Sequence, residues 1–144
     1  MTRLELVALK ASRIRGRLER IRLGIAVGAA QFPSRPDLVE QVAFNMLLAM
    51  QECVDLGSHI VTDEGWGAPA SLGDTFTFLH DHGVIAPETA AGMKAGTRLR
   101  NLIAHGYGDV DPGKLFAAAS SGVGQIERFL AEAGDWATAR TGGG

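Results

Sequence analysis

The chain has 144 residues, of which 46% are hydrophobic and 21% charged, and its net charge is −2. This size and composition indicate one globular domain over residues 1–144, and the absence of a long uncharged apolar run or a signal-peptide pattern argues against a membrane span or secretion. The single cysteine, Cys53, excludes an intramolecular disulfide and fits the reducing cytoplasm, where we expect the protein to work.

The first predicted element is a long amphipathic helix. Its apolar residues recur at spacings of three and four, which places them on one stripe: Leu4, Val7, Ala11, Ile14, Leu18, Ile21 and Ile25. Arginines at positions 13, 15, 17, 20 and 22 fall off this stripe. They can form a solvated face whose long stems cover the flank of the core, or a surface for RNA phosphate or an acidic partner protein. The sequence leaves both interpretations open.

A second helix is predicted from Pro36, whose missing N–H suits a first helical turn, to about Ile60. It is apolar around most of its circumference, so we expect it to be the central element, with Cys53 as a buried, unreactive thiol. A polar row crosses it and consists of Gln41, Asn45, Glu52, Asp55 and His59. This row can face solvent or a subunit interface, or it can support an active site through Asp55 or Glu52.

Residues 61–70 are predicted to form a loop, because Gly65, Gly67 and Pro69 oppose helix continuation. Ser71, with Asp74 three residues later, resembles a capping box and begins a third helix that runs to about His82. His80 and His82 are two residues apart and lie on different faces of this helix, so we expect no metal site there.

A fourth helix is predicted from Pro87 to about Ala104, and a fifth begins where Asp111 and Pro112 supply an N-cap and a first-turn proline. The tail over residues 141–144 is expected to be disordered. No segment shows the alternating pattern of a strand. The sequence therefore predicts an all-α, up-and-down bundle of about five helices.

The most informative stretch closes the fourth helix and reads Arg98-Leu-Arg-Asn-Leu-Ile-Ala-His-Gly-Tyr107. On a regular helix Asn101 and His105 share a face, whereas Arg100 points roughly 140° away from His105. Gly106 favours a left-handed residue after the histidine, so we expect the last turn to unwind. Unwinding would bring the arginine, the histidine and the tyrosine around one point.

Arg100, His105 and Tyr107 offer the chemistry that cleavage of an RNA phosphodiester requires. Imidazole titrates near neutral pH, so His105 can take a proton from a ribose 2′-hydroxyl or return one to the departing 5′-oxygen. The guanidinium of Arg100 stays charged and can hold the phosphate, while Tyr107 can orient the phosphate or stack a base. Such a set needs no metal and no cofactor. The same residues can also be an ordinary helix C-terminus, and an Arg-x4-His pair is common by chance.

The order of motifs along the chain resembles HepT-like toxins of the HEPN superfamily. The stretch from Arg100 to Tyr107 matches their Arg-x4-His-x-Tyr signature, including the asparagine directly after the arginine. The resemblance covers roughly residues 40–130, and further segments carry it in the same order: Asp55–Ile60, Glu64–Ser71, Phe76–Leu79, Gly83–Ile85 and Gly108–Asp111.

This resemblance implies a HEPN-like homodimer in which two copies of the motif line one cleft and cut transfer or messenger RNA without a metal. It assigns catalysis to Arg100 and His105 and a supporting role to Asn101. It also implies an MNT-type nucleotidyltransferase antitoxin, in a type VII-like toxin–antitoxin system, that neutralises the toxin by transferring AMP to Tyr107. The alternatives are a non-catalytic helical module that pairs with a nucleotidyltransferase, and a purely structural bundle.

Overall fold

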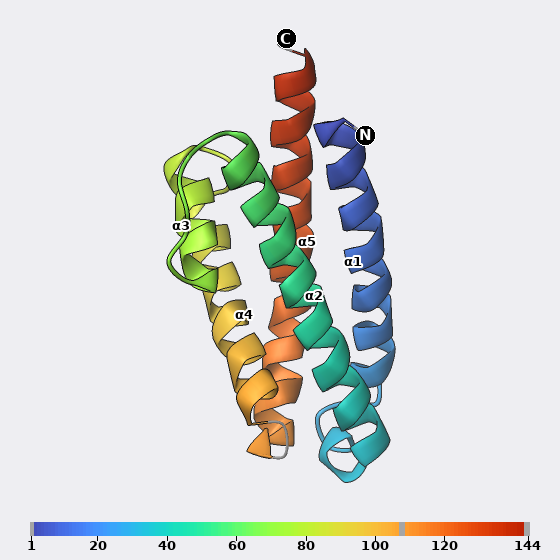
Figure 1. Ribbon diagram of the computed structural model, residues 1–144. Helices are drawn as coiled ribbons and strands as arrows, with labels where there is room; N and C mark the ends of the chain where they lie inside the picture. The colour runs from blue at the N-terminus through green and yellow to red at the C-terminus, as the bar shows by residue number, and fades with distance from the viewer. Residues whose placement is uncertain (1, 107–108, 143–144) are drawn as a thin grey trace.

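The computed structural model describes residues 2–106 and 109–142, which form five α-helices, one 3-10 turn and no strand. The elements are α1 (Arg3–Ile25), η1 (Phe32–Ser34), α2 (Pro36–Asp63), α3 (Leu72–Asp81), α4 (Pro87–His105) and α5 (Pro112–Gly142) (Figure 1). The predicted all-α bundle of five helices is confirmed over this part of the chain. None of these helices is long and apolar enough to cross a membrane.

The central helix of the bundle is α2, as its apolar circumference predicted. It contacts each of the other four helices, and Figure 1 shows α1 on one side of it and α3 and α4 on the other. α1 packs on α2 and α5, on the side of the bundle away from the motif helix. The start of α1 and the end of α5 lie at one end of the bundle, and the C-terminal end of α4 lies at the opposite end (Figure 1).

One apolar core runs between the helices and includes residues from all five of them. The predicted stripe of α1 faces it, with Ile14, Leu18 and Ile21 fully buried. Phe76 of α3 meets Phe129 of α5 edge to face, with ring centroids 5.4 Å apart. Cys53 is buried as predicted, and burial raises the pKa of its thiol because the apolar core disfavours the thiolate.

Side chains fix the helix that carries the motif at its N-terminal end. Glu132 of α5 accepts hydrogen bonds from the backbone N–H of Ala86 and from the hydroxyl of Thr89, each at 2.6 Å. This carboxylate takes the place of a local N-cap, which α4 lacks, and its charge suits the positive end of the helix dipole. The contact fixes α4 to α5 at the end of α4 that lies away from the motif.

Two predicted boundaries are wrong. α2 continues to Asp63, so residues 61–63 are helical and the irregular segment begins at Glu64, whose N–H still bonds to the carbonyl of Ile60 at 3.0 Å. The chain then turns at Gly65, where φ is +71° and a residue without a side chain is favoured. α5 continues to Gly142, so residues 141 and 142 belong to the helix and not to a disordered tail.

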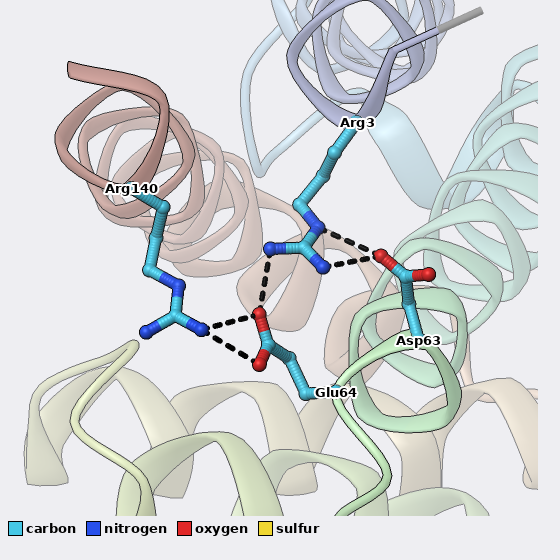
Figure 2. A network of polar contacts seen from close by, with 4 residues as sticks. All are labelled: Arg3, Asp63, Glu64 and Arg140. Carbon is cyan, nitrogen blue, oxygen red and sulfur yellow. Dashed lines mark hydrogen bonds and ion pairs between the residues drawn. The ribbon is translucent and has the colours of Figure 1, made fainter. Parts of the chain in front are cut away.

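An ionic network, here called the clasp, joins three helices at the end of the bundle that carries both termini. Arg3 of α1 bonds to Asp63 and Glu64 at the end of α2, and Arg140 of α5 bonds to both oxygens of Glu64 at 2.7 and 2.8 Å (Figure 2). The ring of Trp136 lies 5.3 and 5.1 Å from the two guanidinium groups. Each cation of the clasp therefore has a carboxylate and an aromatic ring beside it.

Candidate functional site

The motif residues up to Gly106 lie in the last turns of α4 and directly after it, and the helix stays regular through His105. The N–H of Gly106 donates to the carbonyl of Leu102 at 2.8 Å, and the φ of Gly106 is −128°. The predicted left-handed residue at this position is therefore wrong, because the ordinary helical hydrogen bond closes the last turn. A side chain at Gly106 would lie 3.2 Å from the Leu102 carbonyl oxygen, a close approach that favours glycine.

Because the turn does not unwind, Arg100 and His105 keep the roughly 140° separation of a regular helix. Arg100 turns toward α2, where its Nη2 donates to the amide oxygen of Gln51 at 3.2 Å. Its Nη1 donates to Asn101 at 3.2 Å, and its Nε is buried without a partner among the described residues. His105 is exposed, and its side chain makes no hydrogen bond within the described part of the chain. One chain alone therefore does not place both groups around one point.

Sequence reasoning missed Gln51. This residue lies outside the predicted polar row of α2, and its amide is the contact that draws Arg100 toward that helix. The available signal was its spacing of four from Asp55, which puts both residues on one helix face. The register between α2 and α4, which brings Gln51 to Arg100, is not visible in the sequence.

The predicted polar row of α2 divides in the structure. Gln41 and Asn45 face α1, because Gln41 donates to the carbonyl of Arg20 at 2.8 Å and Asn45 accepts from Arg17 at 3.4 Å. Asp55 and His59 are exposed. Asp55 makes no hydrogen bond or ion pair with Arg100 among the described residues, whereas Asn101 accepts a hydrogen bond from that arginine.

Some of the arginines of α1 form ion pairs within the fold. Glu127 of α5 accepts from Arg15 at 3.5 Å and from Arg22 at 3.3 Å. Arg13 and Arg20 are exposed, and their side chains have no polar partner in the described part of the chain. This face lies across the bundle from α4, so it does not continue the surface of the motif.

The two histidines at the end of α3 contact neighbouring groups. His82 stacks on Trp66 with ring centroids 4.1 Å apart, and its Nδ1 lies 2.8 Å from the carbonyl oxygen of Phe78. His80 lies beside Asp81 at 3.3 Å. The described residues contain no group of three or more histidine, cysteine and acidic side chains that could hold a metal ion.

The predicted modification site, Tyr107, lies outside the described residues. Just before it, the chain presents one arginine held by amides, with no carboxylate within ion-pair distance in the described structure, and one exposed histidine. A guanidinium that is positioned but not neutralised suits a phosphate group, and an exposed imidazole suits proton transfer. The fold and site thus define a helical protein with the groups needed to act on a phosphodiester.

The chain belongs to the Ribonuclease HepT-like family, whose model matches residues 14–133. This match confirms the family and the reaction class that the motif order predicted. The chain is 24% identical over 126 residues to the mRNA nuclease HepT of Shewanella oneidensis. This alignment covers 88% of this chain and 94% of that protein. It is 28% identical over 83 residues to the tRNA nuclease HepT of Aphanizomenon flos-aquae, covering 58% of this chain and 56% of that one.

Solved structures of toxin–antitoxin proteins share the fold. A chain in the crystal structure of a toxin–antitoxin with AMP-PNP superposes with a TM-score of 0.82 at 22% identity, covering 89% of this chain and 96% of that one. A chain in the structure of the tri-AMPylated Shewanella oneidensis HEPN toxin in complex with MNT antitoxin gives 0.81 at 23% identity, with 92% and 97% covered. The predicted HEPN-like fold is thereby confirmed.

Proposed function

We propose that this chain is the ribonuclease toxin of a toxin–antitoxin pair, and that it cuts RNA in the cytoplasm with Arg100 and His105 as its catalytic residues. One observation carries the proposal. In a chain of the Ribonuclease HepT-like family, the end of α4 presents an arginine held by Gln51 and Asn101 without a carboxylate, together with an exposed histidine. The relatives named as mRNA and tRNA nucleases support RNA as the substrate.

The geometry of α4 supports a homodimeric site. Since Arg100 and His105 diverge on a regular helix, the Arg100 of one copy can meet the His105 of another when two copies approach along this end of α4. Two apolar side chains near this end of the bundle suit such an approach, because Leu102 is 53% exposed and Phe44 of α2 is 49% exposed. The cleft between two copies would then hold both groups against one phosphate.

Within that cleft, each group has one task. His105 takes the proton of the ribose 2′-hydroxyl or gives one to the departing 5′-oxygen. The 2′-oxygen bonds to phosphorus while the bond to the 5′-oxygen breaks. Arg100 offsets the negative charge that develops on the phosphate oxygens, and its two amide partners fix its direction without reducing its charge.

Neutralisation by an MNT-type nucleotidyltransferase is the second part of the proposal. The Shewanella toxin, which shares this fold, is described as tri-AMPylated and in complex with MNT antitoxin. In this chain the acceptor would be Tyr107, two residues after His105. An AMP group there would add bulk and a negative charge where the substrate phosphate must bind, and both effects oppose binding of RNA.

Cleavage assays with purified protein and total RNA test the catalytic part. We expect His105→Ala to lower the cleavage rate by about 10²-fold or more, the range for loss of a general acid or base. Expression of the wild-type chain should arrest bacterial growth, and the variant should relieve the arrest. Intact RNA in the presence of the wild-type protein, together with capture of a nucleotidyltransferase, would instead support a non-catalytic module.

A further inference from the structure

One face of α4 carries a basic row that ends at the catalytic histidine. Lys94, Arg98, Asn101 and His105 are spaced four, three and four residues apart, so they lie on one side of the helix. The row spans about 16 Å along the helix axis, enough for a few nucleotides of single-stranded RNA. Lys94 is half-buried and Arg98 is exposed, and neither cation has a carboxylate partner in the described part of the chain.

A polar hollow of about 290 Å³ lies beside this row, between α4 and the start of α3. Asp74 lines it from the α3 side, and Lys94, Arg98 and Asn101 line it from α4. Among the described residues no aromatic side chain lines it, so this part of the chain offers charge and hydrogen bonds there but no stacking platform for a base. Such a surface suits the sugar–phosphate backbone of a nucleic acid.

We propose that this basic row binds backbone phosphates of the substrate RNA strand and leads the strand to His105. The inference rests on the proposed function, since it names the path that the substrate takes to the catalytic residues. The unneutralised charges of Lys94 and Arg98 supply the attraction, and their place on the same helix face as His105 supplies the direction. The contribution to RNA affinity is expected to be independent of base sequence.

The arginines of α1 provide an internal comparison. Arg15 and Arg22 share Glu127 and are thereby neutralised within the fold. Arg13 and Arg20 resemble the α4 cations, because they are exposed and have no partner among the described residues. They lie across the bundle, however, so the same change of charge at these two positions should leave RNA binding at the motif unaffected.

Asp74 is the one carboxylate among the residues that line the hollow. It lies in the first turn of α3, where the helix dipole stabilises its negative charge. The same charge repels a phosphate group. The phosphates are therefore placed on the α4 side of the hollow. Asp74→Asn should strengthen RNA binding, an effect opposite in sign to loss of the α4 cations.

The test compares two double variants with equal loss of charge, Lys94→Ala/Arg98→Ala and Arg13→Ala/Arg20→Ala. For the α4 variant we expect a rise of KM for RNA of about tenfold at moderate salt, and a slope of log affinity against log salt that is shallower by about two. The α1 variant should match the wild-type protein in both measurements. Thermal melts of both variants establish that they fold, and Arg98→Lys should recover most of the binding.

Binding of uncleaved RNA to the His105→Ala protein, with and without the α4 substitutions, separates this inference from the proposed function. If the wild-type protein fails to cut RNA, the proposed function fails, while the binding measurement still decides whether the row holds RNA. An unchanged KM for the α4 variant, or an equal rise for the α1 variant, would overturn the inference. If, in addition to an unchanged KM, the α4 variant no longer bound the nucleotidyltransferase, the row would instead be a binding site for an acidic surface of that protein.

Discussion

The clasp and the end of α4 place arginine side chains in opposite surroundings. At the clasp, Arg3 and Arg140 each bond to Glu64 (Figure 2). Both guanidinium groups also lie against the ring of Trp136. Near the end of α4, Arg100 bonds among the described residues only to the neutral amides of Gln51 and Asn101. Charge that is neutralised within the fold ties α1, α2 and α5 together, whereas charge that is left unneutralised is available to an anion.

The second arrangement has a cost in stability. A buried donor without a partner, such as the Nε of Arg100, costs about 1–3 kcal/mol. From this contrast we infer that the clasp serves stability and the end of α4 serves the proposed function, and the following substitutions test that division.

The largest expected effect is on activity. Arg100→Leu should lower the rate of RNA cleavage by about 10²–10³-fold, the range for loss of a charge-stabilising donor. Because the substitution also removes an unpartnered buried donor, the melting temperature should stay the same or rise. Arg128→Leu is the matched control, since Arg128 is exposed and its side chain bonds only to Gln125 within the described part of the chain. A lower melting temperature for Arg100→Leu would make Arg100 a structural residue and break the comparison.

At the clasp the expectation is reversed. Glu64→Gln removes the negative charge that two arginines share. Because the side chain of Glu64 is only 11% exposed, water cannot take over the interactions that the carboxylate makes with them. We expect a loss of about 1–3 kcal/mol in the free energy of unfolding, measured by urea denaturation, with cleavage at 25 °C unchanged. Glu40→Gln, at an exposed position of α2, should leave stability unchanged. Reduced cleavage by folded Glu64→Gln protein would contradict the division.

Gln51→Leu tests whether Gln51 positions Arg100, and its expected effect on the cleavage rate is smaller. Loss of one hydrogen bond to the guanidinium should lower the cleavage rate by about three- to tenfold, corresponding to a typical hydrogen bond. In an Arg100→Leu background the same change should have no further effect, because Gln51 acts through the arginine. Gln41→Leu, on the face of α2 that meets α1, is the control. Additive losses in the double variant would exclude a positioning role for Gln51.

The smallest expected effect is on the pH dependence of stability. The hydrogen bond and charge of Arg3 hold the pKa of Asp63 below its usual value. A carboxyl group with a lowered pKa in the folded state stabilises the fold at neutral pH, and this contribution is lost as pH falls through the folded-state pKa. The difference in melting temperature between the wild-type protein and Asp63→Asn should therefore be largest at neutral pH and should vanish in strong acid. If the difference in melting temperature did not depend on pH, the ion pair between Arg3 and Asp63 would not contribute to stability as described.

Much of the fold was predictable because its signals are local. Pro36, Pro87 and Pro112 begin the helices that their position predicted, and the hydroxyl of Ser71 accepts from the N–H of Asp74 at 3.2 Å. The central part of the α1 stripe, from Val7 to Ile21, is buried as its spacing indicated, and Leu4 and Ile25 at its two ends are partly buried. These features depend on residues within one or two turns of each other, so the sequence contains all the information that they require.

The parts that were missed depend on partners far away in the chain. Glu132 caps α4 from α5, and Arg140 reaches Glu64 across more than half of the sequence. Gln51 meets Arg100 only through the packing of α2 against α4. Gly106 shows the opposite error, because a local rule for glycine predicted an unwound turn where the ordinary helical hydrogen bond prevails. The sequence was enough to name the candidate residues, but not to predict how the fold arranges them.

The central claim is that Arg100 and His105 of two copies act on one phosphate. Its most direct test is the cleavage rate of a heterodimer that contains one Arg100→Ala chain and one His105→Ala chain, isolated with two different affinity tags. Each variant alone should be inactive. The heterodimer should recover about half of the wild-type activity, because one of its two composite sites has both groups intact. An inactive heterodimer of correct mass and normal stability would contradict the account.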